Sequence, residues 1–273
     1  MNAPPQACAA STPTPTPYAP VDRLDGRVAV IVGGAGAIGA QTARRLAALG
    51  VRVALVHRGP GPAKADAVLA MLPAVAAGPH AAFIAEVTDS ASLTRAAAEV
   101  AAQMGPAAIL VNSAGFTQAV PVADLDGLTD ELIDRIFQVN WRGAFATVRA
   151  FAPQMRAVPD AVVVNVSSIA AFTGQGSNLA YAAAKAGTDL MTKALAKALA
   201  PQLRVVGVSP GVVNTGFVPG RGADFNAKAA AATPLRRVGE ADDVARAIVA
   251  LVTTMSFANG TTVVVDGGRH LTL

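Results

Sequence analysis

Short runs of Val, Ile, Leu and Ala alternate along the chain with longer stretches in which apolar residues recur at helical spacing. Such near-continuous apolar runs are typical of parallel strands that are buried on both faces. The expected strands are Arg27–Val32, Val51–Val56, Ala81–Ala85, Ala107–Val111, Ala161–Val166, Leu203–Val208 and Thr262–Val265. Helices between successive strands then predict a doubly wound α/β fold, in which a seven-stranded parallel sheet carries helices on both faces.

The start of the chain departs from this pattern. Residues 1–20 hold six prolines among Ala, Thr and Ser, and no charged residue. This composition is typical of disordered chain, so we expect a disordered tail over residues 1–22 and a single folded domain over residues 23–273. The tail lacks the basic region and the proline-free apolar core of a secretory signal, which predicts a cytoplasmic protein.

Composition argues against several classes of protein. The chain is 52% hydrophobic and 15% charged, and its net charge of +4 is scattered, without the basic run of a nucleic-acid footprint. Its longest uncharged stretches are interrupted by Asn, Ser, Gly and Gln, so no segment predicts a membrane span. The single cysteine, Cys8, and the three histidines form no metal-ligand spacing. We therefore expect no nucleic-acid partner, no membrane partner and no metal.

A glycine-rich turn, Gly33 to Gly39, lies between the first expected strand and a helical stretch. Glycines at such a turn let backbone N–H groups approach a pyrophosphate and let the helix pack closely on the strand. Two registers fit, Gly34-x-Gly36-x-x-Gly39 and the looser Gly33-x-x-x-Ala37-x-Gly39. The turn predicts a Rossmann-like site for a dinucleotide.

The end of the second expected strand bears on which dinucleotide binds. An Asp or Glu about 20 residues beyond the loop would bind the ribose hydroxyls of NAD, whereas Arg accommodates the 2′-phosphate of NADP. The chain has Arg58 at this place, and the first acidic residue downstream is Asp66. Arg58 therefore favours NADP(H). NAD(H) stays open as the alternative, with Arg58 then a solvated side chain at a strand end.

Tyr181 and Lys185 are four residues apart, a spacing that places both on one face of a helix. A phenol with a pKa near 10 transfers protons poorly at neutral pH until a nearby cation stabilises its phenolate. Lys185 can be that cation, and Ser168 can hold a carbonyl oxygen beside the phenol. These residues predict proton transfer at a carbonyl or alcohol group, with hydride carried by the nucleotide.

Taken together and in this order, these motifs resemble the short-chain dehydrogenase/reductase family, in its compact single-domain branch. The resemblance runs from about Arg27 to Gly268. Val32–Gly39 is similar to the family's Thr-Gly-x-x-x-Gly-Ile-Gly loop, with Val for Thr and Ala for the middle Gly. Further segments that match family motifs are Glu86–Val87, Asn112–Gly115, Phe137–Asn140, Ser209–Thr215 and Val264–Gly268. Thr233–Glu240 resembles the matching stretch of 3-oxoacyl-carrier-protein reductases, which relatives of other specificity share.

The resemblance implies that residues 23–273 form one dinucleotide-binding catalytic domain with a tetrad of Asn140, Ser168, Tyr181 and Lys185. In this reading Tyr181 is the general acid, Lys185 lowers its pKa and holds the nicotinamide ribose, and Ser168 binds the carbonyl oxygen. Asn140 organises a water linked to the lysine. The implied cofactor-binding residues are Gly33, Gly36, Ile38, Gly39, Arg58, Glu86, Val87, Asn112, Ala114, Gly115, Tyr181, Lys185, Pro210, Gly211, Val213 and Thr215. The implied substrate contacts are Gln118, Phe172, Gln175, Asn178 and Phe217.

Three functions follow from these expectations. The first is an NAD(P)H-dependent oxidoreductase that reduces a ketone to a secondary alcohol. The second is an NAD-dependent alcohol or hydroxysteroid-type dehydrogenase that works oxidatively. The third is a non-catalytic, nucleotide-sensing binding protein, against which the intact tyrosine–lysine pair argues. The expected partner in the first two is a small-molecule carbonyl or alcohol substrate.

The resemblance also bears on assembly, because family members of this size are commonly homotetramers. Two helical stretches offer large apolar side chains at helical spacing, more than one buried face readily absorbs. These side chains are Trp141, Phe145, Phe151, Leu190, Met191, Leu195 and Leu199. We expect a homotetramer, with a dimer as the alternative.

Overall fold

The computed structural model describes residues 24–59, 62–219 and 224–272, so the expected tail lies outside the described residues. The strands are β1 Val28–Val32, β2 Arg52–His57, β3 Ala81–Ile84, β4 Ala107–Asn112, β5 Ala161–Val166, β6 Leu203–Pro210 and β7 Thr262–Val265. They form one parallel sheet in the order β3-β2-β1-β4-β5-β6-β7. The seven-stranded, doubly wound parallel sheet predicted from the sequence is confirmed.

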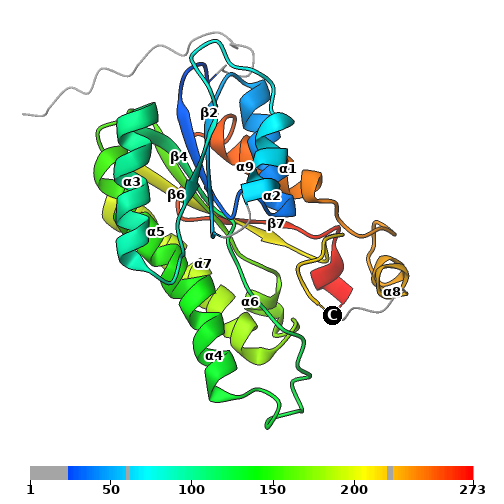
Figure 1. Ribbon diagram of the computed structural model, residues 1–273. Helices are drawn as coiled ribbons and strands as arrows, with labels where there is room; N and C mark the ends of the chain where they lie inside the picture. The colour runs from blue at the N-terminus through cyan, green and yellow to red at the C-terminus, as the bar shows by residue number, and fades with distance from the viewer. Residues whose placement is uncertain (1–23, 60–61, 220–223, 273) are drawn as a thin grey trace, which may run out of the picture.

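Helices cover both faces of this sheet. The α-helices are α1 Ala37–Ala48, α2 Pro62–Ala70, α3 Ser90–Met104, α4 Asp130–Phe137, α5 Gly143–Met155, α6 Ala170–Thr173, α7 Leu179–Leu199, α8 Phe225–Ala231 and α9 Ala241–Val252. A π-helical turn, η1 Gln138–Arg142, joins α4 to α5, and a 3₁₀ turn, η2 Arg269–Thr272, follows β7. Figure 1 shows α1, α2 and α9 on one face of the sheet and α3, α4, α5 and α7 on the other.

The two faces of β1 show why the strands are apolar throughout. Val28, Val30 and Val32 pack into the core beneath α3 and α5, whereas Ala29 and Ile31 pack into the core beneath α1 and α9. All five side chains are buried. A strand with two buried faces keeps every position apolar, which is the pattern that the sequence displays.

The strand order places a ligand site between β1 and β4. From β1 the chain winds outward through β2 and β3, then returns to the other side of β1 and continues from β4 to β7. In open α/β sheets, ligands bind beyond the carboxyl ends of the strands at the point where this order reverses. Gly33 lies there with φ +81°, and a Cβ on it would be 2.6 Å from the Ala114 nitrogen. The glycine therefore lets the turns after β1 and β4 meet.

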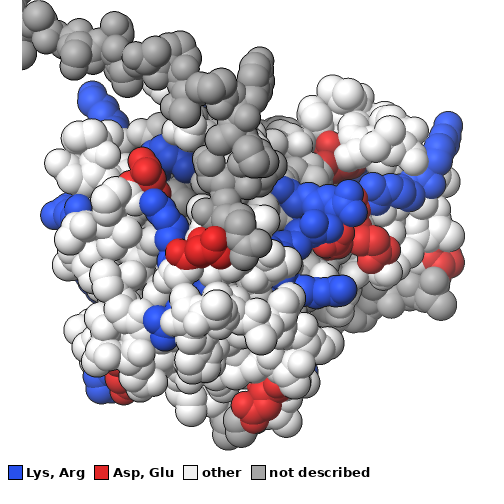
Figure 2. Space-filling model, turned by 90° about the horizontal axis from the view of Figure 1, so that it is seen from above, with Lys and Arg blue, Asp and Glu red and all other residues white. Residues whose placement is uncertain are grey.

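Charged side chains of both signs share the surface. Figure 2 shows acidic side chains lying among the basic ones on the face that it presents. Several of them are paired, as where Arg45 and Arg246 both contact Asp242. Within the described ranges, no helix is long and apolar enough to cross a membrane.

Two of the apolar residues expected at a subunit interface are instead buried within the chain. Phe151 is completely buried and Met191 is nearly so, and Phe151 packs in the core beneath α3 and α5. Trp141 and Leu190 remain at the surface, with 38% and 67% of their area exposed. The expected interface thus loses Phe151 and Met191, because both side chains are buried within the chain itself.

Candidate active site

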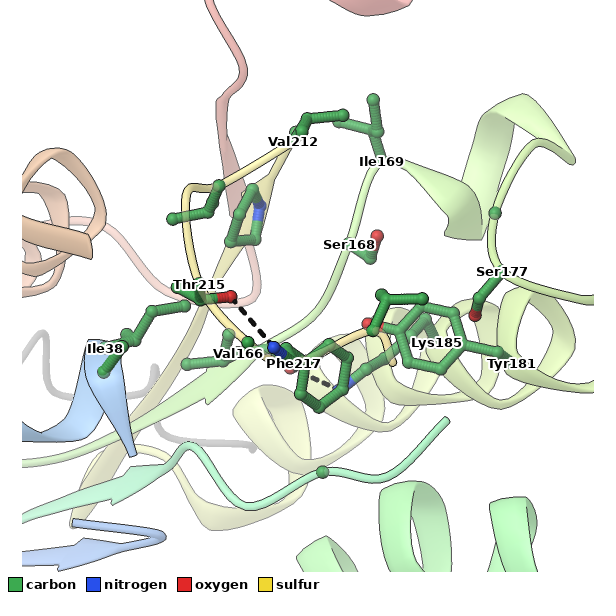
Figure 3. Close-up of a pocket in the computed structure, with 18 of the residues that line it drawn as sticks. Ile38, Val166, Ser168, Ile169, Ser177, Tyr181, Lys185, Val212, Thr215 and Phe217 are labelled. Carbon is green, nitrogen blue, oxygen red and sulfur yellow. Dashed lines mark hydrogen bonds between the residues drawn. The ribbon is translucent and has the colours of Figure 1, made fainter. Parts of the chain in front are cut away.

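A cavity of about 900 Å³ lies at the carboxyl ends of the central strands. Most of its lining comes from turns that follow β1, β4, β5 and β6 and from the start of α7 (Figure 3). The segments that line it include Ala35–Ile38 after β1, Ser113–Gly115 after β4, Val166–Ile169 at the end of β5, and Pro210–Val213 at the end of β6. The strand order alone brings these distant segments together.

Lys185 lies in α7 with only 4% of its area exposed. Its Nζ donates a hydrogen bond to the Val166 carbonyl at 2.8 Å, drawn as a dashed line in Figure 3. Burial lowers the pKa of Lys185 from 10.5 to about 8, and the nearby Asp189 carboxylate partly opposes this change. The ammonium therefore stays protonated at neutral pH, inside the cavity wall, where its field is poorly screened by water.

Tyr181 lies in the first turn of α7, with 9% of its area exposed. Its backbone N–H donates to Asn178 Oδ1 at 2.7 Å, so the helix cap also fixes the tyrosine. The Lys185 Nζ lies 5.6 Å from the centre of the Tyr181 ring. A positive side chain and a helix N-terminus both favour a phenolate over a phenol.

Ser168 follows β5 and faces the same cavity (Figure 3). Its Oγ accepts a hydrogen bond from the Ala170 backbone N–H at 3.2 Å, so its own proton remains available to a ligand oxygen. The adjacent Ser167 is buried, and its Oγ donates to the Lys185 carbonyl at 3.3 Å. Ser168 is thus the better placed of the two serines to bind a carbonyl oxygen.

Asn140 is 1% exposed and lies behind the cavity lining. Its Nδ2 donates to the carbonyls of Phe116 at 2.7 Å and Ile136 at 2.9 Å, and its Oδ1 accepts from the Phe116 N–H at 3.3 Å. A Cβ on Gly115 would lie 3.0 Å from that Oδ1. The side chain therefore fixes the segment after β4 against η1, next to a residue that lines the cavity.

The N-terminus of α1 opens onto the other end of the cavity, at Gly36, Ala37 and Ile38. The N–H groups of its first turn have no partner within the helix, and no side chain among the described residues caps it. Gly39 keeps the loop tight, since a Cβ there would lie 2.5 Å from the Gly33 oxygen. Free N–H groups at a helix N-terminus bind phosphate, so this end of the cavity fits the pyrophosphate of a dinucleotide.

Comparison with known proteins identifies the family. The sequence profile of the family described as Enoyl-(Acyl carrier protein) reductase matches residues 33–270. The chain is 36% identical over 245 residues to cis-4-hydroxycyclohexanecarboxylate dehydrogenase of Sinomonas cyclohexanicum, covering 89% of this chain and 96% of the relative. The chain belongs to the short-chain dehydrogenase/reductase family. This oxidoreductase family uses NAD(P)(H) and acts on small molecules.

Two further relatives agree with this assignment. The 3-oxoacyl-(acyl-carrier-protein) reductase of Thermotoga maritima is 30% identical over 260 residues, covering 90% of this chain and 98% of the relative. A crystal structure from Brucella melitensis, named short-chain dehydrogenase/reductase SDR:Glucose/ribitol dehydrogenase, superposes with a TM-score of 0.84 at 29% identity. The superposition covers 91% of this chain and 98% of that one.

Many of the site residues expected from the sequence line the cavity of this short-chain dehydrogenase/reductase. They are Gly36, Ile38, Ala114, Gly115, Ser168, Gln175, Tyr181, Lys185, Pro210, Gly211, Val213, Thr215 and Phe217. Thr215 Oγ1 accepts a hydrogen bond from the Phe217 N–H at 3.3 Å, and the Phe217 ring lies 6.0 Å from that of Tyr181 (Figure 3). Phe217 thus stands over the phenol, on the segment after β6.

Other expected cofactor residues lie outside the lining. They are Gly33, Gly39, Arg58, Glu86, Val87 and Asn112. Glu86 Oε1 accepts a hydrogen bond from the Thr88 N–H at 3.3 Å, and Asn112 Nδ2 donates to Asn165 Oδ1 at 2.9 Å, so both have structural contacts. Arg58 is exposed at the end of β2.

Three expected substrate contacts do not line the cavity either. Asn178 is 1% exposed, caps α7 and donates to the Gln118 carbonyl at 2.7 Å, so its amide is committed to the fold. The Gln118 side chain points to solvent. Phe172 is 52% exposed, and its ring meets that of His270 edge to face at 5.7 Å. The resemblance to the family suggested all three, but the helix and loops that carry them turn their side chains away from the cavity.

Residues that were not expected from the sequence also line the cavity, among them Lys64, Val120 and Arg269. Ser177 bonds Thr117 through the two hydroxyls, which closes the wall beside Tyr181 (Figure 3). Arg269 lies in η2, in the turn after β7. β7 is the edge strand on the side of the sheet away from β2 and β3, three strands beyond β4, which neighbours the strand β1 that precedes the glycine loop. A basic residue in the turn that follows the last strand was the available signal.

Proposed function

We propose that the protein reduces a ketone to a secondary alcohol with NADPH, through Tyr181 as general acid. The observation that carries this proposal is the arrangement of Ser168, Tyr181 and the buried ammonium of Lys185 on one wall of the cavity. The proposed catalytic domain spans residues 23–273. When bound, the reduced nicotinamide supplies the hydride that the carbonyl carbon takes up.

The side chains divide the remaining work. Ser168 donates a hydrogen bond to the carbonyl oxygen and thereby stabilises the negative charge that develops there. Tyr181 gives its proton to that oxygen, and the phenolate left behind is stabilised by the Lys185 ammonium. Asn140 holds the segment after β4 in place and is proposed to organise the water that returns a proton. Lys185 keeps two N–H donors beyond its bond to Val166, enough to hold a ribose hydroxyl.

We propose NADP(H) as the preferred cofactor, with NAD(H) as the alternative. Arg58 is exposed at the end of β2, and Lys64 of α2 lines the cavity that Ala35–Ile38 also line. No Asp or Glu is found among the described residues that line this cavity. Two cations without a carboxylate suit a 2′-phosphate better than a ribose diol. Values of kcat/KM with NADPH and NADH test the preference, and a higher value with NADH refutes it.

Turnover of a panel of ketones by wild type and Tyr181→Phe tests the reaction. Removing a general acid costs at least about 10²-fold in rate, so the variant should lose turnover by that factor while NADPH binding persists. A variant that reduces the preferred ketone at a near-normal rate refutes the assignment of Tyr181. A wild type that binds NADPH but turns over no carbonyl or alcohol would indicate a nucleotide-sensing protein.

The oxidative direction is the second candidate function. The relative from Sinomonas cyclohexanicum is named as a dehydrogenase of a cyclic hydroxy acid. Reversal of each step makes the Tyr181 phenolate the base that accepts the alcohol proton. Rates with alcohols and NAD⁺, compared with rates for ketones and NADPH, decide between the two directions.

We also propose a homotetramer, with a dimer as the alternative. Trp141 and Leu190 are exposed, and Phe145 stacks on Trp141 with ring centres 6.1 Å apart. A Cβ on Gly187 would lie 2.8 Å from the Trp141 ring, so the indole lies directly on α7. This apolar face, on η1, α5 and α7, would be covered in an assembly. Light scattering should give about four chains per particle, and Trp141→Glu should lower that number. An active wild-type monomer refutes the proposal.

A further inference from the structure

One charged residue of the cavity has no role in the chemistry described so far. Arg269, the first residue of η2, lines the cavity together with Phe225 of α8. Its guanidinium donates a hydrogen bond to the Ala229 carbonyl at 3.2 Å, and it forms no ion pair with any described residue. A guanidinium carries five N–H donors, so most of its donors remain available to a ligand.

The backbone that carries Arg269 is held firmly. The side chain of Asp266 is only 4% exposed, and its Oδ1 accepts from the Gly268 N–H at 2.9 Å. Its Oδ2 accepts from the His270 N–H and contacts His270 Nδ1, both at 2.7 Å. Burial raises the pKa of Asp266, but the hydrogen bonds from His270 and Gly268 together outweigh it and hold the pKa below its usual value, so the carboxylate keeps its charge. Because the Asp266 carboxylate is bonded to Gly268 and His270, it forms no ion pair with Arg269.

The place of Arg269 in the sheet separates it from the cofactor cations. Arg58 and Lys64 follow β2, whereas Arg269 follows β7, five strand spacings or about 24 Å away. Ser168 follows β5, only two spacings or about 10 Å from β7. The edge contact between Phe172 of α6 and His270 brings η2 beside the segment that carries Ser168. Arg269 therefore stands at the substrate end of the cavity.

We propose that Arg269 binds a carboxylate on the substrate, so that the protein acts on oxo acids or hydroxy acids. This assignment rests on the proposed reduction of a ketone. The planar guanidinium pairs with both oxygens of a carboxylate, and the cavity wall around it offers no competing acid among the described residues. The paired carboxylate would hold the substrate at one end while Ser168 and Tyr181 engage its carbonyl at the other. Arg269 is a specificity-determining residue in this arrangement.

The test compares acids with their neutral counterparts. The probes are 3-oxobutanoate, 4-oxopentanoate and 5-oxohexanoate, the methyl ester of each, and the N-acetylcysteamine thioester of 3-oxobutanoate. Wild type should prefer at least one acid over its ester by about tenfold or more in kcat/KM. Arg269→Gln should lower kcat/KM for that acid by about 30-fold or more, and for the ester by less than about threefold. Arg269→Lys should restore part of the loss, since it keeps the charge but not the planar fork.

Arg236→Gln is the matched control. The Arg236 guanidinium donates to the Ala231 carbonyl of the same helix α8, but Arg236 does not line the cavity, so this variant should match wild type on every probe. The proposal is overturned if wild type has an equal or higher kcat/KM for the ester or thioester than for the acid. It is also overturned if Arg269→Gln lowers kcat/KM for acid and ester by the same factor.

A second measurement separates this inference from the proposed reduction. If wild type reduces none of the ketones, the proposed reduction fails, and calorimetric titration of the same acids and esters in the presence of NADP⁺ decides the role of Arg269. Tighter binding of an acid than of its ester in wild type, lost in Arg269→Gln, supports the carboxylate site. Equal binding of acid and ester overturns it.

Discussion

Replacing Lys185 by Met should abolish turnover and yet make the fold more stable. Burial lowers the pKa of Lys185 from 10.5 to about 8, which means that the fold holds an ammonium ion in a place that disfavours charge. Since each pKa unit corresponds to about 1.4 kcal/mol, the charged side chain costs about 3 kcal/mol of stability at neutral pH. Met has a similar length and fills the space without that cost.

Lys185→Met also removes the hydrogen bond from Lys185 Nζ to the Val166 carbonyl, and this loss offsets part of the increase in the free energy of unfolding. An unpaired buried acceptor costs about 1–3 kcal/mol, so we expect a net gain of about 1 kcal/mol in the free energy of unfolding. Turnover and cofactor affinity should both fall, because the variant lacks the cation beside Tyr181 and the donor for the ribose.

The pH dependence tests the cause directly. The pKa of Lys185 is lower in the folded than in the unfolded chain, so between about pH 8 and pH 10.5 the unfolded chain binds more protons, and wild-type stability gains from this residue as pH rises. The free energy of unfolding of Lys185→Met should therefore exceed that of wild type by the largest amount below about pH 8. Above that pH the excess should shrink by up to about 1.4 kcal/mol per pH unit. Urea unfolding of both proteins from about pH 7 to pH 9.5 measures this difference.

Lys193→Met is the control, because Lys193 is exposed on the same helix α7. We expect it to change stability by less than about 0.5 kcal/mol, with no trend in pH. If the free energies of unfolding of Lys185→Met and wild type differ by the same amount over this whole pH range, the reasoning from burial is refuted.

Four further substitutions probe the cap, the loop and the cofactor cations. Asn178→Ala should lower the free energy of unfolding by about 1–2 kcal/mol and reduce kcat, as measured by urea unfolding and steady-state kinetics, because the α7 cap positions Tyr181. Gly39→Ala should abolish NADPH binding in a fluorescence titration, since its Cβ would lie 2.5 Å from a backbone oxygen, and undiminished binding contradicts this view of the loop. Arg58→Asp and Lys64→Glu should each shift the ratio of kcat/KM values toward NADH, and an unchanged ratio in both argues against a 2′-phosphate site.

The fold could be predicted from the sequence because its signals are local and repeated. Each strand is a run of apolar residues, and burial on both faces makes that run continuous, as in β1 and β5. The main departure was at β6, which extends to Pro210 where Val208 was the expected end. Ser209 and Pro210 are polar or turn-forming by type, yet both continue the strand and pair with Val264 and Val265.

The site was only partly predictable, for a different reason. Ser168, Tyr181 and Lys185 follow from chemistry and spacing, but the direction of a side chain depends on packing that sequence does not display. Asn178 has the polarity of a ligand contact, yet the start of α7 uses its amide as a cap. Arg269 is far from Ser168 in sequence, and only the strand order brings the turn after β7 to the same cavity.

Hydrogen bonds to the backbone or to a helix cap hold the segments that carry the three proposed catalytic side chains. The Lys185 ammonium is bonded to the Val166 carbonyl, the Tyr181 backbone to the Asn178 cap, and the Ser168 hydroxyl to the Ala170 N–H. These anchors belong to β5, α6 and α7, which pack on the same sheet, so the spacing of the reacting atoms is set by the core. The turns after β6 and β7 carry Phe217 and Arg269 and contribute none of these three anchors. Substitutions in those two turns can therefore change which substrate is accepted while the proton-transfer geometry stays fixed.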